Sequence, residues 1–529
     1  MGAVLARTAF LMEVVMVIKI LMLVVFFAVL IAVGVLSRKS AKNVDGFVLG
    51  GRSVGPWLTA FAYGTSYFSA VIFIGYAGQF GWKFGVASTW IGLGNAIIGS
   101  LLAWVILGRR TRLMTHKLNS STMPEFFAKR FDSKGLRIGS SIIIFIFLIP
   151  YTASLYNGLS RLFEMAFHID YKYCIIAMAV LTGIYVIVGG YMATAINDFI
   201  QGIIMLIGIV AVILAVLNVN GGFMGSMIEL SKVAGDFPEY NGAYTSFVGP
   251  LPMDLLGVVI LTSLGTWGLP QMVQKFYAIK HEDAIKKGTI ISTFFAIVVA
   301  GGCYFLGGFG RLFLTQDQVS AMGFDAIVPT MLATLPDILI AVVVILVLSA
   351  SMSTLSSLVL TSSSTLTLDF ISGTIVKNMG EKAKLIWLRV LVVVFIVISS
   401  IIALIQYSSN VTFIAQLMGV SWGALAGAFL APFLFSLYWK KATKASCWAC
   451  FIFGSGIMVA NMLFRDSFPA LLKSPINCGA FAMLAGFIIV PVISLISKKP
   501  SDSLVEEAFS SYERKVTVKS KTVLEEEEE

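Results

Sequence analysis

The sequence predicts an all-α polytopic membrane protein with about thirteen membrane-spanning helices. The chain of 529 residues is 58% hydrophobic and only 12% charged, and its mean hydropathy is +0.90. Apolar stretches of roughly 20 residues recur along nearly its whole length, and each is long enough to cross a hydrocarbon core about 30 Å thick. A soluble domain of this size would expose too much apolar surface to water. Transmembrane barrel strands would be shorter and would alternate between apolar and polar residues.

The expected spans follow one another with mostly short connections. The first covers about residues 14–36. Ten more are expected at about 57–80, 86–108, 136–165, 173–190, 194–217, 251–275, 286–309, 332–366, 385–406 and 410–438, and two at about 445–464 and 478–497. The loops between them therefore alternate between the two sides of the membrane.

Positive charge is concentrated in every second loop. The chain has 38 Lys and Arg against 28 Asp and Glu, a net charge of +10. The basic loops are 37–52, 108–137, 275–287, 377–384 and 438–444, whereas the loops of the other set carry only scattered basic residues. Because basic loops stay in the cytoplasm, we expect the N-terminus outside and the C-terminus inside the plasma (inner) membrane. The same bias explains the positive charge without a nucleic-acid partner.

Small and polar residues interrupt the middle of two expected spans. Span 57–80 contains AYGTSYFSA, and span 251–275 contains LTSLGTWGLPQ. Glycine and proline weaken a helix interior, and a membrane tolerates broken backbone only where it faces protein or a cavity. These are the first spans of two consecutive five-span sets, and matching interruptions in two halves point to the binding site of an inverted-repeat transporter. The alternative is an ordinary glycine-rich packing face.

A run of hydroxyl side chains lies inside the apolar span 332–366, in LVLSASMSTLSSLVLTSSS. On a helix, Ala350, Ser353, Thr354 and Ser357 share one face. Hydroxyl oxygens, together with carbonyls released by a broken helix, can replace the water around a small monovalent cation and still release it, because they carry no full charge. The alternative is that the hydroxyls bond to their own helix or to neighbouring helices.

Most ionisable residues of the expected spans fall at span ends, but Asp198 is different. In GGYMATAINDFIQGIIMLIG it lies in the first turns of an apolar helix. A carboxylate at that depth is costly unless it is paired or functional, and such groups commonly mark ion paths. The alternative is a residue at the cytoplasmic end that the helix N-terminus stabilises.

Together these motifs resemble the sodium:solute symporter family (solute carrier family 5-like), nearest its bacterial proline and pantothenate permease branch. The resemblance is carried by LGGRSVGPWLTAFAYGTSYFSA, MPEFFAKRFDSKGLR, YVIVGGYMATAINDFIQGIIML and SASMSTLSS. It covers essentially all of the ten-span core. It implies a LeuT-type five-plus-five inverted-repeat core and sodium-coupled uptake of a small organic solute by alternating access.

The resemblance also divides the chain into segments. It implies an extra N-terminal helix with a cytoplasmic loop in 1–56, the first repeat in 57–217, an extracellular loop in 218–250, the second repeat in 251–438, two C-terminal helices in 439–497 and a charged cytoplasmic tail in 498–529.

The ion sites are implied by the same resemblance. The family's principal sodium site maps onto the backbone carbonyls of Thr65, Phe68 and Ala350 and the hydroxyls of Ser353 and Thr354. A second sodium site, found in some members, maps onto Asp198 with Ser353, Ser356 and Ser357. Na+ is therefore the expected coupling ion, with two ions moved per solute, although members that move one ion keep much of this pattern.

The solute is expected near the membrane midplane, between the two interrupted helices. Its candidate lining residues are Ser66, Tyr67 and Ser69 in the first helix and Thr266, Trp267 and Gln271 in the second, with Tyr76 and Trp90 as candidate outer-gate aromatics. Ordinary helix packing is the alternative for each of them.

Departures from the family's patterns narrow the range of expected solutes. Sugar-carrying relatives have polar groups where Ile72 and Ile91 stand, and apolar residues there would leave sugar hydroxyls unpaired. Proline-carrying relatives have aromatics where Thr262 and Thr266 stand. An amino acid or organic acid fits best, with a pantothenate-like solute as the close alternative and a sugar as the weaker one.

Two other classes of membrane protein compete with a symporter. An intramembrane enzyme would need clustered His, Asp, Glu or Cys at membrane depth, and the 3 histidines fall in loops or at span ends. A passive channel would not need paired interrupted helices. We therefore expect a transporter without enzymatic activity.

Overall fold

The computed structural model describes residues 2–167, 169–234, 236, 242–376, 378–409 and 414–513. Within these ranges every regular element is helical, apart from an isolated bridge between Val54 and Ile279. The end of the expected tail, 514–529, and the start of the last core span, 410–413, lie outside the described residues.

The described part contains 11 helices that are long and apolar enough to cross a membrane. Two of them each cover more than one expected span, Val71–Lys117 with 47 residues and Tyr171–Val219 with 49. The others correspond to single expected spans, so together they account for about thirteen passages. The predicted class, an all-α polytopic membrane protein, is confirmed.

The first part of the chain runs from α1 to α10. Its helices are α1 (Gly2–Ser37), α2 (Val44–Leu49), α3 (Pro56–Tyr67), α4 (Ala77–Phe84), α5 (Thr89–Gly94), α6 (Arg109–Lys117), α7 (Met123–Phe131), α8 (Lys134–Phe167), α9 (Tyr171–Val219) and α10 (Gly222–Ser231). Further helical turns at Val71–Tyr76, Asn95–Leu102 and Trp104–Gly108 join α3 to α6 into two long passages.

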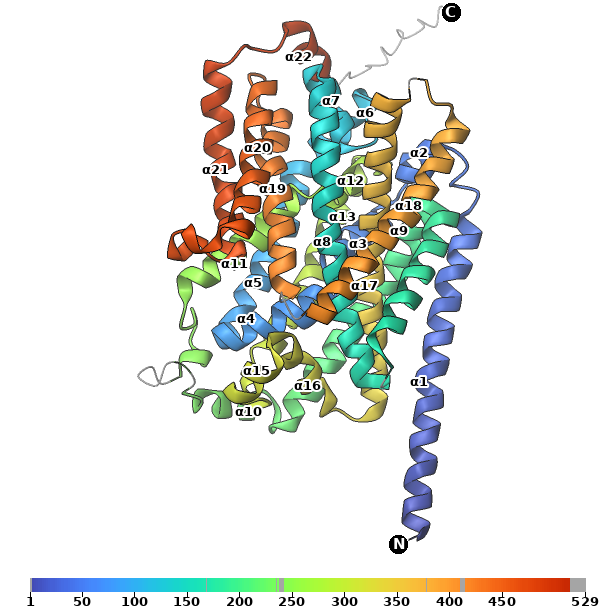
Figure 1. Cartoon of the computed structure of the whole chain (residues 1–529), viewed down its shortest axis with the longest axis vertical. Helices are drawn as coiled ribbons and strands as arrows, with labels where there is room; N and C mark the ends of the chain where they lie inside the picture. The colour runs from blue at the N-terminus through green and yellow to red at the C-terminus, as the bar shows by residue number, and fades with distance from the viewer. Residues whose placement is uncertain are drawn as a thin grey trace, which may run out of the picture.

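The second part runs from α11 to α22. Its helices are α11 (Pro252–Leu264), α12 (Pro270–Tyr277), α13 (Asp283–Ala296), α14 (Gly302–Gly307), α15 (Gln316–Met322), α16 (Ile327–Ala333), α17 (Asp337–Thr365), α18 (Glu381–Ser409), α19 (Ile414–Tyr438), α20 (Lys444–Leu463), α21 (Pro475–Ile496) and α22 (Asp502–Phe509). Figure 1 shows α6, α7 and α22 at one end of the molecule and α10, α15 and α16 at the other.

Both interrupted helices that the sequence predicts are broken in the structure. α3 ends at Tyr67 because Phe68 adopts an extended conformation with φ −83° and ψ 120°. The second break lies between α11 and α12, where Leu269 is extended with φ −80° and ψ 121° and Pro270 starts α12. Proline suits a first helical position, since it has no N–H to leave unpaired there. Each break frees carbonyl oxygens inside the protein.

α9 holds two expected spans and bends between them at Gly190. This residue has φ 55° and ψ −147°, a conformation that is essentially restricted to glycine. A side chain there would also meet the carbonyl oxygen of Phe47 at 2.8 Å. The bend sets the direction of the helical arm that carries Asp198.

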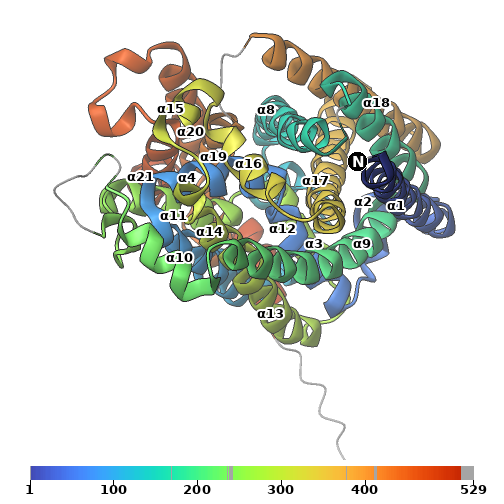
Figure 2. The same cartoon turned by 90° about the horizontal axis from the view of Figure 1, so that it is seen from below.

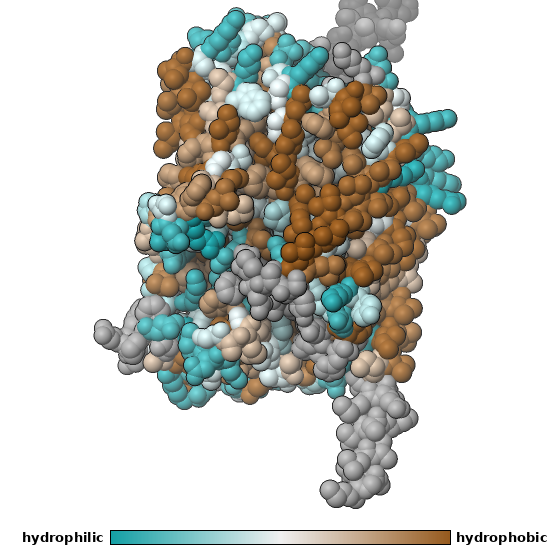
Figure 3. Space-filling model, in the orientation of Figure 1, coloured by the Kyte–Doolittle hydropathy of each residue, from teal (hydrophilic) through white to brown (hydrophobic). Residues whose placement is uncertain are grey.

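The broken helices lie in the interior of the bundle. α3 contacts α9, α12, α13 and α17, and Figure 2 shows α3 and α12 surrounded by longer helices. Large apolar side chains are exposed on the outer faces of α1, α9, α18 and α21. Figure 3 shows a broad apolar area across the middle of the face in view. This distribution suits a protein with lipid around it and polar groups inside.

Candidate functional site

Five oxygen atoms converge where the first broken helix meets α17. The Ser353 hydroxyl donates to the Thr65 carbonyl at 3.2 Å and to the Ala350 carbonyl at 3.1 Å. The Thr354 hydroxyl lies 3.1 Å from the Thr65 and Ala350 carbonyl oxygens and 3.3 Å from that of Phe68. The structure therefore brings together all five residues that the resemblance assigns to a first ion site.

The chemistry of this cluster suits a monovalent ion. All five residues are fully buried, and their oxygens are neutral carbonyls and hydroxyls. In the described residues, no group of three or more His, Cys, Asp or Glu is placed to hold a metal ion. Neutral oxygens can strip water from a small cation without binding it too tightly to release it. The break at Phe68 supplies the carbonyls of Thr65 and Phe68, because a continuous helix would use them internally.

The residues predicted for a second ion site lie around Lys275, which the sequence analysis did not predict as a site residue. Asp198 of α9 is fully buried and forms an ion pair with Lys275 of α12, with 3.6 Å between Oδ2 and Nζ. Lys275 also donates to the Ser357 hydroxyl at 2.9 Å. The sequence places Lys275 at the start of a basic loop, whereas the structure buries it within the last turn of α12. The sequence feature that could have indicated a buried Lys275 is its position only five residues after Pro270, inside the second interrupted span.

The other members of this set make different contacts. The Ser356 hydroxyl donates to the Ser353 carbonyl of its own helix at 3.0 Å. Ser66, a candidate solute residue, instead shares a hydrogen bond of 2.8 Å with Ser357. The Ser353 hydroxyl points to the first cluster. Ser357 is thus the hydroxyl that the structure joins to Asp198, through Lys275.

Four of the candidate solute residues carry polar atoms that are left unpaired. Tyr67, Ser69, Tyr76 and Gln271 are all buried, and their side-chain polar atoms make no hydrogen bond to any described residue. Buried polar groups are normally satisfied. Unpaired groups between two broken helices are therefore available to a solute.

The remaining candidates bond to backbone. The Thr266 hydroxyl donates to the Gly99 carbonyl at 3.1 Å, and the Trp267 indole to the Ile98 carbonyl at 2.9 Å. Trp90 is partly exposed, and its indole donates to the carbonyl of Phe247 at 2.8 Å. These three contacts hold helices and loops together, as expected if these residues serve helix packing and not solute binding.

Two further aromatic residues, Trp422 and Tyr151, lie near Tyr67 and also carry unpaired polar atoms. The Trp422 ring lies 5.7 Å from the Tyr67 ring and 5.9 Å from the Tyr151 ring, measured between centroids. The Trp422 indole nitrogen and the Tyr151 hydroxyl make no hydrogen bond to any described residue. The sequence offered a weak signal for each, a tryptophan among small residues in GVSWGALAG and a tyrosine directly after Pro150.

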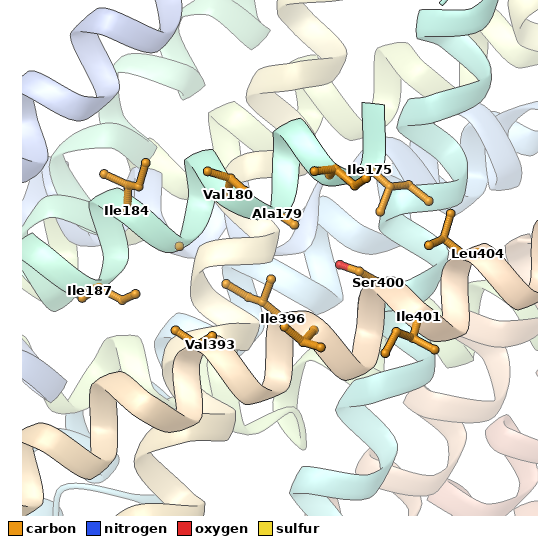
Figure 4. A pocket seen from close by; sticks show the side chains of 13 residues that line it. Ile175, Ala179, Val180, Ile184, Ile187, Val393, Ile396, Ser400, Ile401 and Leu404 are labelled. Carbon is orange, nitrogen blue, oxygen red and sulfur yellow. The ribbon is translucent and has the colours of Figure 1, made fainter. Parts of the chain in front are cut away.

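An apolar hollow of about 370 Å³ lies elsewhere, between α9 and α18. Figure 4 shows its lining of aliphatic side chains from these two helices, with Ser400 as the polar exception. A solute site needs several polar groups that fix orientation. This hollow therefore does not have the composition of the solute site.

The match to known proteins covers the broken helices and the ion cluster together. A family model described as the sodium:solute symporter family matches residues 47–454, more than half of the chain. The chain belongs to the sodium:solute symporter family. Its activity is therefore sodium-coupled symport of a solute, with Na+ as the coupling ion.

Several relatives resemble this symporter along nearly its full length. A sodium/proline symporter of Staphylococcus aureus (strain JH9) is 30% identical over 494 residues, which cover 91% of this chain and 93% of the relative. That of the bovine strain RF122 / ET3-1 is 29% identical over 494 residues. Both relatives are named as transporters, as the sequence predicts for this chain.

A solved structure shares the fold. A Na+-coupled sialic acid symporter in a substrate-bound outward-open state matches with a TM-score of 0.73 and 16% identity, over 92% of this chain and 99% of its own. The expected five-plus-five architecture is confirmed, and the symporter is a multi-pass membrane protein.

Proposed function

We propose that this symporter takes up an amino acid or small organic acid with sodium ions, the first of which binds between α3 and α17. The observation that carries the proposal is the convergence of the Thr65, Phe68 and Ala350 carbonyls with the Ser353 and Thr354 hydroxyls. When sodium binds, the two hydroxyls turn their hydrogens away and offer lone pairs. The ion then joins the broken helix of one repeat to the third helix of the other.

The second ion is proposed at Asp198, with the hydroxyls of α17 beside it. Its full negative charge suits a cation more than neutral oxygens do, and burial strengthens the attraction. The Asp198 oxygens accept no hydrogen bond from any described residue, so they are available to an ion. We therefore propose that two ions enter with each neutral solute.

The solute is proposed to lie against Tyr67, Ser69, Tyr151, Gln271 and Trp422. Aromatic faces with a few polar groups suit a small molecule that has an apolar body and a charged or amide end. The sodium/proline symporters at 30% identity support an amino acid. Thr262 donates to its own helix at 2.9 Å and supplies no aromatic ring, which favours an amino acid other than proline.

The cytoplasmic face is proposed at the end where α6, α7 and α22 lie. The basic loops gather there and contact one another. Arg52 donates to the Ser120 carbonyl, and Arg109 pairs with Glu282 at 2.8 Å. The Arg110 guanidinium lies 4.6 Å from the Tyr512 ring centroid. Basic loops remain in the cytoplasm, so we propose that the C-terminus lies inside and the N-terminus outside.

Uptake into proteoliposomes tests the function. Labelled amino acids, carboxylates and pantothenate are offered with an inward sodium gradient, and with choline in place of sodium as the control. We expect one solute class to accumulate above its external concentration only with sodium. Accumulation that is equal in choline, or equilibration without accumulation, would contradict sodium-coupled symport.

A further inference from the structure

Lys275 takes part in neither the first ion cluster nor the proposed solute site, yet it is 97% buried at membrane depth, since its side chain is 3% exposed. A buried ammonium is costly unless it is paired. Its contacts are the Asp198 carboxylate, the Ser357 hydroxyl and the face of the Tyr191 ring, 5.2 Å from Nζ to the centroid. Each of these three groups stabilises a positive charge at the position of the Lys275 ammonium.

The same groups form the proposed second sodium site. Asp198 would supply the charge for a sodium ion and Ser357 a neutral oxygen, and both are in contact with Nζ of Lys275. A sodium ion at this position would lie against the ammonium at a few Å, where two like charges in a low dielectric repel strongly. One cation therefore excludes the other.

The ion pair is loose enough to be replaced. The separation of 3.6 Å is long for a charge-assisted hydrogen bond, which is typically about 2.7–2.9 Å. Asp198 accepts no hydrogen bond from any described residue. A lysine ammonium also sits on a flexible stem with four carbons, which lets it swing aside without moving the backbone.

We propose that Lys275 is a tethered cation that occupies the second sodium site whenever sodium is absent from it. This inference rests on the proposed function of Asp198 and Ser357. It gives the lysine a role in the transport cycle, because a bare carboxylate in the membrane would oppose the return of the unloaded carrier. Sodium entry at Asp198 then requires displacement of the ammonium, which lowers the apparent affinity of that site.

Binding of ²²Na⁺ to the purified protein tests the proposal without any solute. The Asp198→Asn variant defines the part of the binding that belongs to the second site, and Ser353→Ala the part that belongs to the first. We expect Lys275→Met to lower the sodium concentration for half-saturation of the second site by about fivefold or more. The same change in an Asp198→Asn background should have no effect.

Lys280→Met is the matched control, because Lys280 is exposed and follows Lys275 closely in the chain. Its sodium binding should equal that of the unmodified protein. Second-site binding that is unchanged or weaker in Lys275→Met, with first-site binding intact, would overturn the proposal. Absence of Ser353-dependent binding in the unmodified protein would instead contradict the proposed function.

A second variant covers the case in which Lys275→Met does not fold. Lys275→Arg keeps the positive charge and can contact a carboxylate through two N–H groups. It should hold Asp198 more firmly and weaken second-site sodium binding by about fivefold or more. Second-site binding equal to that of the unmodified protein would overturn the proposal in this case as well.

Discussion

At the scale of residues, the hydroxyl run of α17 divides by hydrogen-bond partner. Ser353 and Thr354 reach across to carbonyls of α3, and Ser357 reaches Ser66 and Lys275. The hydroxyls of Ser353 and Thr354 also donate to the Ala350 carbonyl of their own helix. Further hydroxyls that donate to carbonyls of this helix are those of Ser351, Ser356, Ser363, Ser364 and Thr365. Bonding within the helix and contact across to other helices, the two alternatives left open by the sequence, thus both occur in this run, and Ser353 and Thr354 do both.

Substitution of Ser353 tests the first ion site. Ser353→Ala removes one hydroxyl ligand and leaves the backbone carbonyls in place. We expect the sodium concentration for half-maximal uptake to rise about tenfold or more, because a hydrogen bond to a charged group contributes about 1.5–3 kcal/mol. Uptake at saturating sodium should be largely retained.

Ser351→Ala is the control for that experiment. Ser351 is buried on the same helix, and its hydroxyl donates to the Val347 carbonyl at 2.8 Å. This variant should keep the sodium dependence of the unmodified protein. An unchanged sodium dependence in Ser353→Ala would count against Ser353 as a ligand.

At the scale of elements, breaks and bends decide where functional groups lie. The break after Tyr67 frees the carbonyls of the first site, and the break before Pro270 starts the short helix that carries Lys275. The bend of α9 at Gly190 directs Asp198 toward that lysine. Three interrupted elements therefore assemble the proposed ion sites from distant parts of the chain.

Replacement of Gly190 tests the role of the bend. Gly190→Ala places a methyl group 2.8 Å from the Phe47 carbonyl oxygen at φ 55°. Strain in this region of backbone space costs about 1–3 kcal/mol, and the contact adds to it. We expect a lower melting temperature and a loss of sodium-driven uptake.

Gly456→Ala is the control for the Gly190→Ala variant. Gly456 lies within α20, and a side chain there would meet no atom within 4 Å. Alanine is also the better helix former, so stability should be equal or higher. Equal melting temperatures for Gly190→Ala and the unmodified protein would rule out a strained bend.

At the scale of the whole molecule, the two proposed ions set the driving force. Each inward charge gains about 2.3 kcal/mol per 100 mV, and a tenfold sodium gradient adds about 1.4 kcal/mol. Two ions would thus supply about 7.4 kcal/mol, enough for roughly 10⁵-fold accumulation of a neutral solute.

Charge counting checks this stoichiometry. Current and labelled uptake are measured together in proteoliposomes held at a fixed potential. We expect two charges to enter with each neutral solute, and one charge per solute in the Asp198→Asn variant. One charge per solute in the unmodified protein would contradict a second coupled ion.

From the sequence alone, the fold class and the two breaks could be predicted, together with most residues of the proposed first ion site. These features depend on local properties, namely apolar length, glycine and proline within spans, and hydroxyls on one helix face. The sequence also indicated Asp198 as a functional carboxylate, since few acids occur at that depth.

The contacts that these residues make across the bundle depend on the tertiary structure. Lys275 reads as the first residue of a basic loop, and its contact with Asp198 exists because α12 packs beside α17 while α9 bends toward both. The same holds for Trp422 and Tyr151, which meet Tyr67 from separate helices. Contacts between residues far apart in the chain depend on how helices pack, and sequence periodicity describes one helix at a time.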